Sequence, residues 1–183
     1  MARIPYFDMT RAPPAYQELL KARHPLNLYR MLPHAGPSAA AGFLAMGSAL
    51  LRDNELDSRL REIAILRVGI LSKAGYEVHQ HKRVARQVGL SDAKIAALET
   101  GADLAALDET EQLVLRFTDT VFHDVKAPDA LFNAVTAKFG PRQTAELVLT
   151  IGFYMLVSRF LENFEVDIEP PGTSEPPIHP STP

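Results

Sequence analysis

The chain has 183 residues, of which 46% are apolar, and it contains no cysteine. This length and composition fit one soluble globular domain with a substantial core. The lack of cysteine excludes disulfides, thiolate metal sites and thiol redox chemistry within these residues. A formal net charge of −3 offers no general attraction for nucleic acid or an anionic membrane, so we expect neither as a partner.

Proline marks both ends of the chain. Pro5, Pro13 and Pro14 interrupt helix hydrogen bonding and predict an N-terminal arm over residues 1–30, with a short helix near 15–23. The first 14 residues lack the continuous apolar region of a signal peptide, so we expect a cytoplasmic protein. Six further prolines predict an extended or disordered tail over 169–183, which leaves residues 31–168 as a single domain.

The segments between the two arms have the patterns and end signals of helices. The first expected helices are 37–52, a segment from Asp57 or Ser58 through LREIAILRVGIL, and the segment YEVHQHKRVARQVG, which ends at Gly89. Two further helices are expected to begin at Ser91 and at Asp108. The last two are the segment 128–138, which ends at Gly140, and a long helix that begins at Pro141. These boundaries are predicted from capping residues at the helix starts and from glycines at the helix ends. The β-branched residues of LREIAILRVGIL keep a strand open as an alternative there. The pattern as a whole predicts an all-α domain of about seven or eight helices.

The last predicted helix, RQTAELVLTIGFYMLVSRFLENFE, is apolar around most of its circumference. Its most apolar run, 147–157, is about half the length of a membrane span, so we expect a buried helix. A domain of this size has few places to bury such a helix on every side, and we therefore expect a homo-oligomer in which part of it faces another copy. A central helix in a monomeric bundle is the alternative.

The stretch GYEVHQH, residues 75–81, is the most promising chemical motif. On a helix Glu77 and His81 share a face, whereas His79 lies about 200° away from both. A carboxylate can hold an imidazole in one tautomer and raise its basicity, so this pair suits proton transfer without a cofactor. Tyr76 lies near the edge of the same face. The same spacing also fits an ordinary surface ion pair.

Three further residues are candidates for contacts with a substrate. His34 precedes helix 37–52, His79 lies beside the Glu77/His81 pair in sequence, and the guanidinium of Arg67 could bind a substrate carboxylate. A loop position for His34, exposure of His79 and a salt bridge for Arg67 are the alternatives.

Residues 62–99 resemble the core of the carboxymuconolactone decarboxylase family, which includes the alkylhydroperoxidase D-like proteins. The resemblance extends over residues 40–125 and rests on Glu62, the positions of Ala74 and Glu77, Tyr76, His81, and the run Ala85, Gly89, Leu90 and Ser91. In the peroxidase branch a C-x-x-C pair occupies positions 74 and 77. The resemblance is therefore to the branch without cysteine, which carries Y-E-x-x-x-H, and a thiol peroxidase activity is excluded.

This resemblance implies an alkylhydroperoxidase D-like helical bundle that assembles as dimers, trimers or hexamers. It also implies a cofactor-independent lyase, decarboxylase or isomerase that acts on a small carboxylated, lactone-like molecule. In that reaction His81 would donate and accept the proton, and Glu77 would orient it or act as a second base. Glu62 would be the second carboxylate, and Tyr76 would donate a hydrogen bond.

Two other functional classes remain open on the sequence. A metal-dependent enzyme could use Glu62, Glu77 and His81 as ligands, with His79 as a fourth, although the predicted helix turns His79 away. The chain could also be a small-molecule-binding oligomer without catalytic activity. The expectation for cofactors and metals is none.

Overall fold

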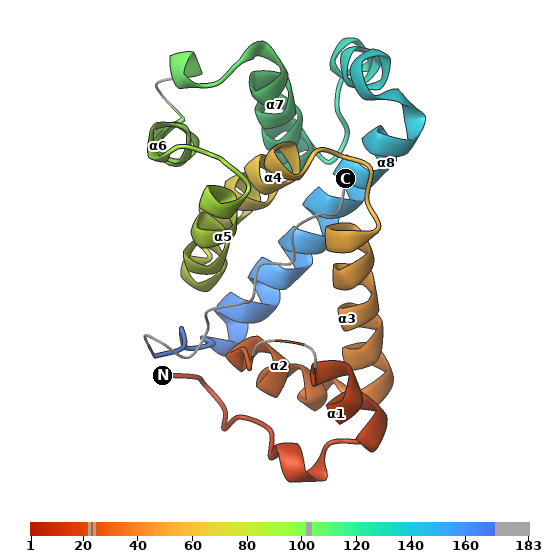
Figure 1. The fold of residues 1–183 in the computed structure, drawn as a ribbon, viewed down its shortest axis with the longest axis vertical. Coiled ribbons are helices and arrows are strands. Elements are labelled where there is room, and N and C mark those ends of the chain that lie inside the picture. The colour runs from red at the N-terminus through yellow and green to blue at the C-terminus, as the bar shows by residue number, and fades with distance from the viewer. Residues whose placement is uncertain (22, 24, 102–103, 171–183) are drawn as a thin grey trace. The chain divides into compact units, whose positions relative to one another are not determined.

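The structure, a computed structural model, describes residues 1–21, 23, 25–101 and 104–170. All regular elements in these residues are helical (Figure 1), which confirms the expected all-α fold. The eight α-helices within the described residues are α1 (Pro14–Leu20), α2 (Asn27–Met31), α3 (Pro37–Arg52), α4 (Ser58–Leu71), α5 (Gly75–Gln87), α6 (Asp92–Thr100), α7 (Glu109–Asp124) and α8 (Asp129–Phe164). Short 3-10 turns cover Met9–Arg11, Leu32–Ala35 and Leu104–Ala106. Residues 171–183 of the predicted tail lie outside the described residues.

The chain divides into two compact units, one formed by residues 1–48 with the segment that begins at Asn163, and one formed by residues 49–162. In the first unit the N-terminal arm is hydrogen-bonded to the C-terminal segment. The Tyr6 hydroxyl donates to Asp167 Oδ2 at 3.0 Å, and the Asp167 backbone N–H donates to the same hydroxyl at 2.9 Å. The Arg3 backbone N–H also donates to the carbonyl of Phe164 at 3.0 Å. The domain limits predicted from proline content stay predictions.

Helix α4 is the central helix of the second unit. It packs against α5, α6 and α7 (Figure 1), and its apolar residues Ile63, Ile65 and Leu66 are buried. Gly69 allows α4 and α5 to approach closely, because a Cβ at this position would lie only 3.2 Å from Cγ2 of Val78. This close approach brings side chains of α4 and α5 within hydrogen-bond distance of one another.

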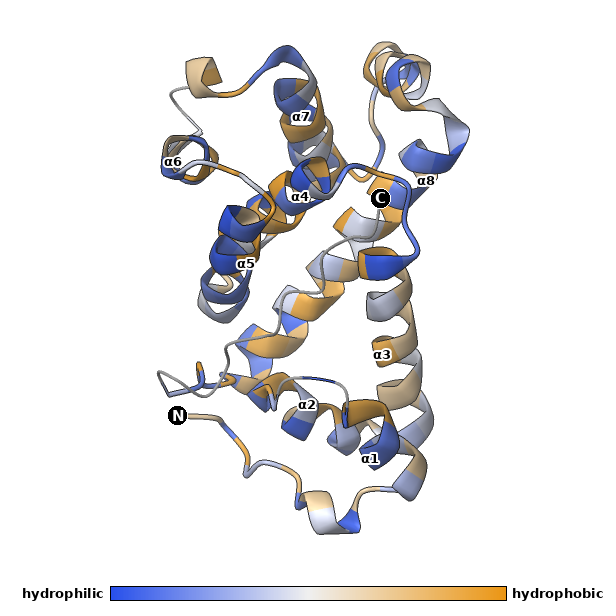
Figure 2. Ribbon diagram, in the orientation of Figure 1, coloured by the Kyte–Doolittle hydropathy of each residue, from blue (hydrophilic) through white to orange (hydrophobic). Residues whose placement is uncertain are grey.

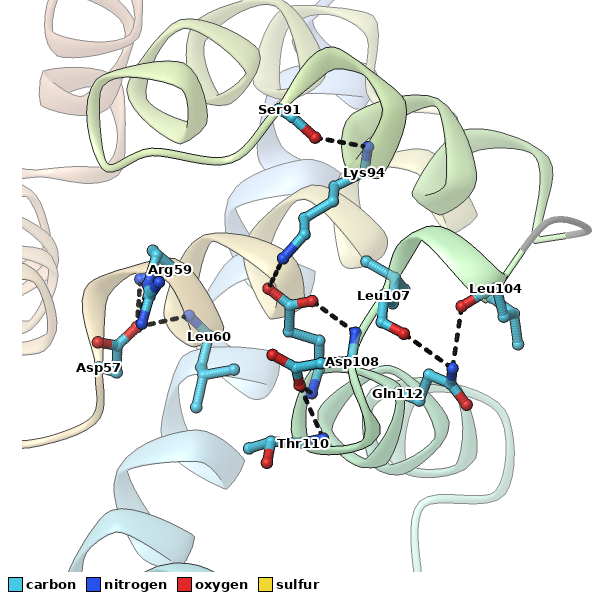
Figure 3. Close-up of polar contacts among 11 residues, drawn as sticks. Asp57, Arg59, Leu60, Ser91, Lys94, Leu104, Leu107, Asp108, Thr110 and Gln112 are labelled. Atoms are coloured by element: carbon cyan, nitrogen blue, oxygen red, sulfur yellow. Dashed lines mark hydrogen bonds and ion pairs between the residues drawn. The ribbon is translucent and has the colours of Figure 1, made fainter.

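Local capping chemistry fixes the helix starts in the second unit. The Asp57 carboxylate caps α4 and the Ser91 hydroxyl caps α6. Asp108 and Glu111 form a capping box at the start of α7 (Figure 3), and Lys94 pairs with the same Glu111. The capping residues expected from the sequence therefore act as such in the structure.

Helix α8 contains the interruption that Gly140 and Pro141 predict. Gly140 has φ 76°, outside the helical region, so the segments before and after it are two helices in geometry. By length and composition alone, α8 could cross a membrane, a test that the core helices of soluble proteins also pass. In the second unit its residues Leu147, Ile151 and Tyr154 are buried, as in a core helix.

Candidate acid–base site

Glu62 is a charged residue in the middle of an otherwise apolar helix face. Its side chain is fully buried, with 0% exposed, among the apolar residues of α4. A buried carboxylate is strongly destabilising unless a charged or hydrogen-bonding partner compensates it. The partner of Glu62 is His81 on α5, whose Nδ1 lies 2.7 Å from Glu62 Oε2.

A second carboxylate lies on the other side of the same imidazole. Nε2 of His81 is 3.2 Å from Oε1 of Glu77, four residues earlier on α5, as the helical spacing predicts. Figure 2 shows α5 as a mainly hydrophilic helix, yet Glu77 is only 4% exposed. The side chains of Glu62, Glu77 and His81 form what we call the acid–base cluster.

The geometry of the cluster determines where its protons lie. A neutral imidazole has one N–H and can donate to only one carboxylate, whereas an imidazolium donates from both ring nitrogens. Burial favours the neutral ring, but the charge of Glu62 and its hydrogen bond, followed by those of Glu77, outweigh burial and raise the pKa of His81 to about 10. At neutral pH His81 is therefore an imidazolium that donates to two carboxylates.

The sequence assigned the role of orienting partner to Glu77, and the structure gives Glu62 the shorter contact. Tyr154 of α8 also reaches the cluster, with its ring 5.0 Å from the His81 ring and nearly perpendicular to it. Perpendicular arrangements of this kind are a favoured geometry for aromatic pairs, so this contact favours the observed orientation of the imidazole. Sequence reasoning missed Tyr154, because it lies in a long apolar helix and 73 residues after His81, so no spacing rule connects them.

The other predicted site residues lie in varied surroundings. Tyr76 is buried in the first turn of α5, at 4% exposure, whereas His79 is exposed on the same helix. Arg67 donates to both oxygens of Asp119, at 2.6 and 2.9 Å, and to the carbonyl of Leu98. Its guanidinium is thus engaged by protein groups. His34 belongs to the first unit, where its Nε2 lies 2.9 Å from the Pro5 carbonyl oxygen.

The cluster brings together Glu62, Glu77 and His81, the three residues that were considered as metal ligands, but it does not point them at a common position. Its two carboxylates approach opposite nitrogens of one ring, so an ion bound at either nitrogen would have only one of the carboxylates beside it. Among the described residues, no group of three or more His, Asp or Glu side chains has an arrangement suited to a metal ion.

A cavity of about 330 Å³ opens elsewhere in the second unit. Its lining residues come from α7 and from the first part of α8: Glu109, Thr110, Gln112, Leu113, Arg116 and Lys138. None of them belongs to the acid–base cluster. We therefore place the candidate chemistry at the cluster, where buried ionised groups meet, and not at this cavity.

Comparison with known families addresses the resemblance noted in the sequence. Residues 37–120 match the carboxymuconolactone decarboxylase family. This match spans just under half of the chain. The part that matches the carboxymuconolactone decarboxylase family contains all three members of the acid–base cluster, whereas Tyr154 lies beyond it.

Several solved structures share the fold. An uncharacterised peroxidase-related protein from Ralstonia eutropha JMP134, with an alkylhydroperoxidase AhpD core, superposes with a TM-score of 0.77 at 18% identity over 92% of each chain. A peroxidase-related protein from Silicibacter sp. TM1040 gives 0.71 at 18% identity, over 90% of this chain and 89% of the other. A cysteine-to-alanine variant of the debrominase Bmp8, in complex with 2,3,4-tribromopyrrole, gives 0.69 at 14% identity, over 92% and 94%.

These similarities establish the alkylhydroperoxidase D-like fold. None of the curated proteins matches the sequence. The residues of the acid–base cluster are therefore the basis for assigning a reaction.

Proposed function

We propose that the chain is a cofactor-independent lyase, a decarboxylase or an isomerase, that acts on a small carboxylated, lactone-like molecule by acid–base chemistry. The observation that carries this proposal is the His81 ring held between the carboxylates of Glu62 and Glu77. An imidazole with a carboxylate at each nitrogen can deliver a proton to a substrate and be reprotonated afterwards.

His81 is the proton donor in this proposal. When a substrate loses CO₂, the electron pair of the broken carbon–carbon bond stays on the substrate as a carbanion or enolate. The His81 imidazolium donates a proton to that carbon, and the neutral ring is then reprotonated from solvent. An isomerisation uses the same groups, with a carboxylate removing a proton from one carbon while His81 donates one to another.

The two carboxylates have different roles in this proposal. Glu62 is fully buried and lies 2.7 Å from Nδ1, so it acts through His81 by orienting the ring and stabilising its positive charge. Glu77 makes the longer contact, 3.2 Å to Nε2. The weaker contact is the easier one to exchange for a substrate atom, so we assign the substrate-facing side of the ring, and the role of second base, to Glu77.

Thiol peroxidase chemistry does not enter the proposal. The positions that carry cysteines in the peroxidase branch are Ala74 and Glu77 here, and the 183 residues contain no cysteine. A peroxidase of that kind needs a thiolate that attacks the peroxide and a second thiol that resolves the product.

We also infer that the protein acts as a cytoplasmic homo-oligomer. Leu149 and Leu156 of α8 are 51% and 52% exposed, and Val148 is 39% exposed. Apolar side chains exposed along one helix support an interface between copies.

The proposed function is tested by turnover of small unsaturated lactone acids and β-keto acids. The wild type should convert at least one of them after dialysis against a metal chelator, and His81→Ala should lower kcat by about 10²- to 10⁴-fold. His123→Ala, which removes an exposed histidine of α7, is the matched control and should leave kcat unchanged. Turnover that survives His81→Ala would remove His81 from the mechanism. Activity that is lost on chelation and restored by a divalent metal would favour the metal-dependent alternative.

A further inference from the structure

Arg61, directly before Glu62 on α4, has no counter-charge among the described residues. Its side chain is half-buried, its Nε is shielded from solvent, and its guanidinium has no hydrogen-bond or ion-pair partner in that part of the chain. A guanidinium has five N–H donors and is always charged. Partial burial of such a group without an acceptor is destabilising, so it needs an explanation.

Two other arginines already donate hydrogen bonds to protein groups. Arg67 is held by Asp119 and Leu98, and Arg159 donates to the carbonyl of Met155. Glu62 does not neutralise Arg61 although the two are neighbours, because consecutive side chains on a helix diverge by about 100°. Oε1 of Glu62 itself has no hydrogen-bond partner among the described residues.

The charge of the acid–base cluster means that binding of a substrate carboxylate beside it requires a further positive group. Two carboxylates and one imidazolium give the cluster a net charge of −1. A substrate carboxylate that approaches this cluster is repelled unless another positive group lies within reach. Arg61 directly precedes Glu62 on α4, so a ligand that contacts His81 with one end can place its carboxylate over the neighbouring face of the helix, where the long side chain of Arg61 extends.

We propose that Arg61 binds the carboxylate of the substrate at the acid–base cluster and selects anionic over neutral ligands. A carboxylate accepts two parallel hydrogen bonds from a guanidinium, which supplies the missing counter-charge. This inference rests on the proposed function for the class of ligand. It adds the residue that recognises the carboxylate, a role that the sequence analysis gave to Arg67.

Binding can test Arg61 without any turnover. Calorimetric titration of the full chain should use paraconate, a five-membered lactone with a carboxylate, and γ-butyrolactone, the same ring without it. We expect the wild type to bind paraconate more tightly than γ-butyrolactone. Arg61→Gln should lower the affinity for paraconate about ten-fold or more and leave the affinity for γ-butyrolactone unchanged. Arg61→Lys keeps the charge but loses the paired donors, so its affinity for paraconate should lie between those of the wild type and Arg61→Gln.

Arg116→Gln is the matched control, because it removes the same charge from an exposed arginine of α7 that lines the separate cavity. Equal paraconate binding by wild type and Arg61→Gln would overturn the assignment, as would a loss found only in Arg116→Gln. A change of oligomeric state in Arg61→Gln, seen by light scattering, would overturn it in favour of a protein carboxylate as the partner. Charge-selective binding without turnover of any lactone acid would reject the lyase proposal and leave the Arg61 assignment standing.

Discussion

Replacing Glu62 with alanine should destabilise the second unit more than any other single change in the acid–base cluster. The variant removes a fully buried carboxylate and leaves Nδ1 of His81 without its 2.7 Å partner. Breaking a buried ion pair from one side typically costs about 3–5 kcal/mol, and we expect the low end because Glu77 still contacts the ring. The free energy of unfolding, measured by urea denaturation near neutral pH, checks this value.

His79→Ala provides the control for that measurement. His79 is exposed on the same helix as His81, and exposed substitutions usually change stability by less than about 0.5 kcal/mol. A Glu62→Ala protein as stable as His79→Ala would mean that the Glu62–His81 pair contributes nothing to folding. The buried position of Glu62 would then need another explanation.

The second large effect is a loss of stability as the pH rises. The pKa of His81 is about 10 in the folded protein, against an ordinary value of 6.5. The folded state therefore holds a proton that the unfolded state releases, and the resulting stabilisation is complete below pH 6.5 and disappears as the pH approaches 10. Between pH 6.5 and pH 9 the wild type should lose a few kcal/mol of unfolding free energy through this group.

The variant His81→Gln isolates that contribution from all other titrating groups. Its unfolding free energy should decrease less than that of the wild type over the same pH range, and the difference between the two curves should be largest at pH 6.5. Parallel curves for the two proteins would show that His81 has the same pKa in the folded and unfolded states.

Local chemistry made most of the fold predictable from the sequence. Asp57, Ser91 and Asp108 cap helices because a short polar side chain reaches the free N–H groups of the first turn, whatever the rest of the chain does. The break at Gly140 follows from glycine and proline geometry in the same way. These features depend on neighbours within four residues, and such features can be recognised in a sequence.

The candidate site was predictable only in part, because most of its contacts join residues that are far apart in the sequence. The contact of Glu77 with His81 follows from helical spacing, whereas Glu62 was included through the family resemblance. The contact of Tyr154 with His81 joins α8 to α5, and it depends on how helices pack. The unpartnered guanidinium of Arg61 is likewise a property of the folded surroundings, and no sequence pattern distinguishes it from Arg67.

The proposed mechanism requires that His81 is protonated at neutral pH, and ¹⁵N NMR of the imidazole measures this protonation directly. The His81 signals can be assigned by comparison with His81→Gln. We predict that both ring nitrogens carry hydrogen at pH 7 and up to about pH 9, as the two carboxylate contacts and the raised pKa require. A ring with one unprotonated nitrogen at pH 7 would contradict the proposed mechanism, since His81 would then be a base at rest and not the proton donor.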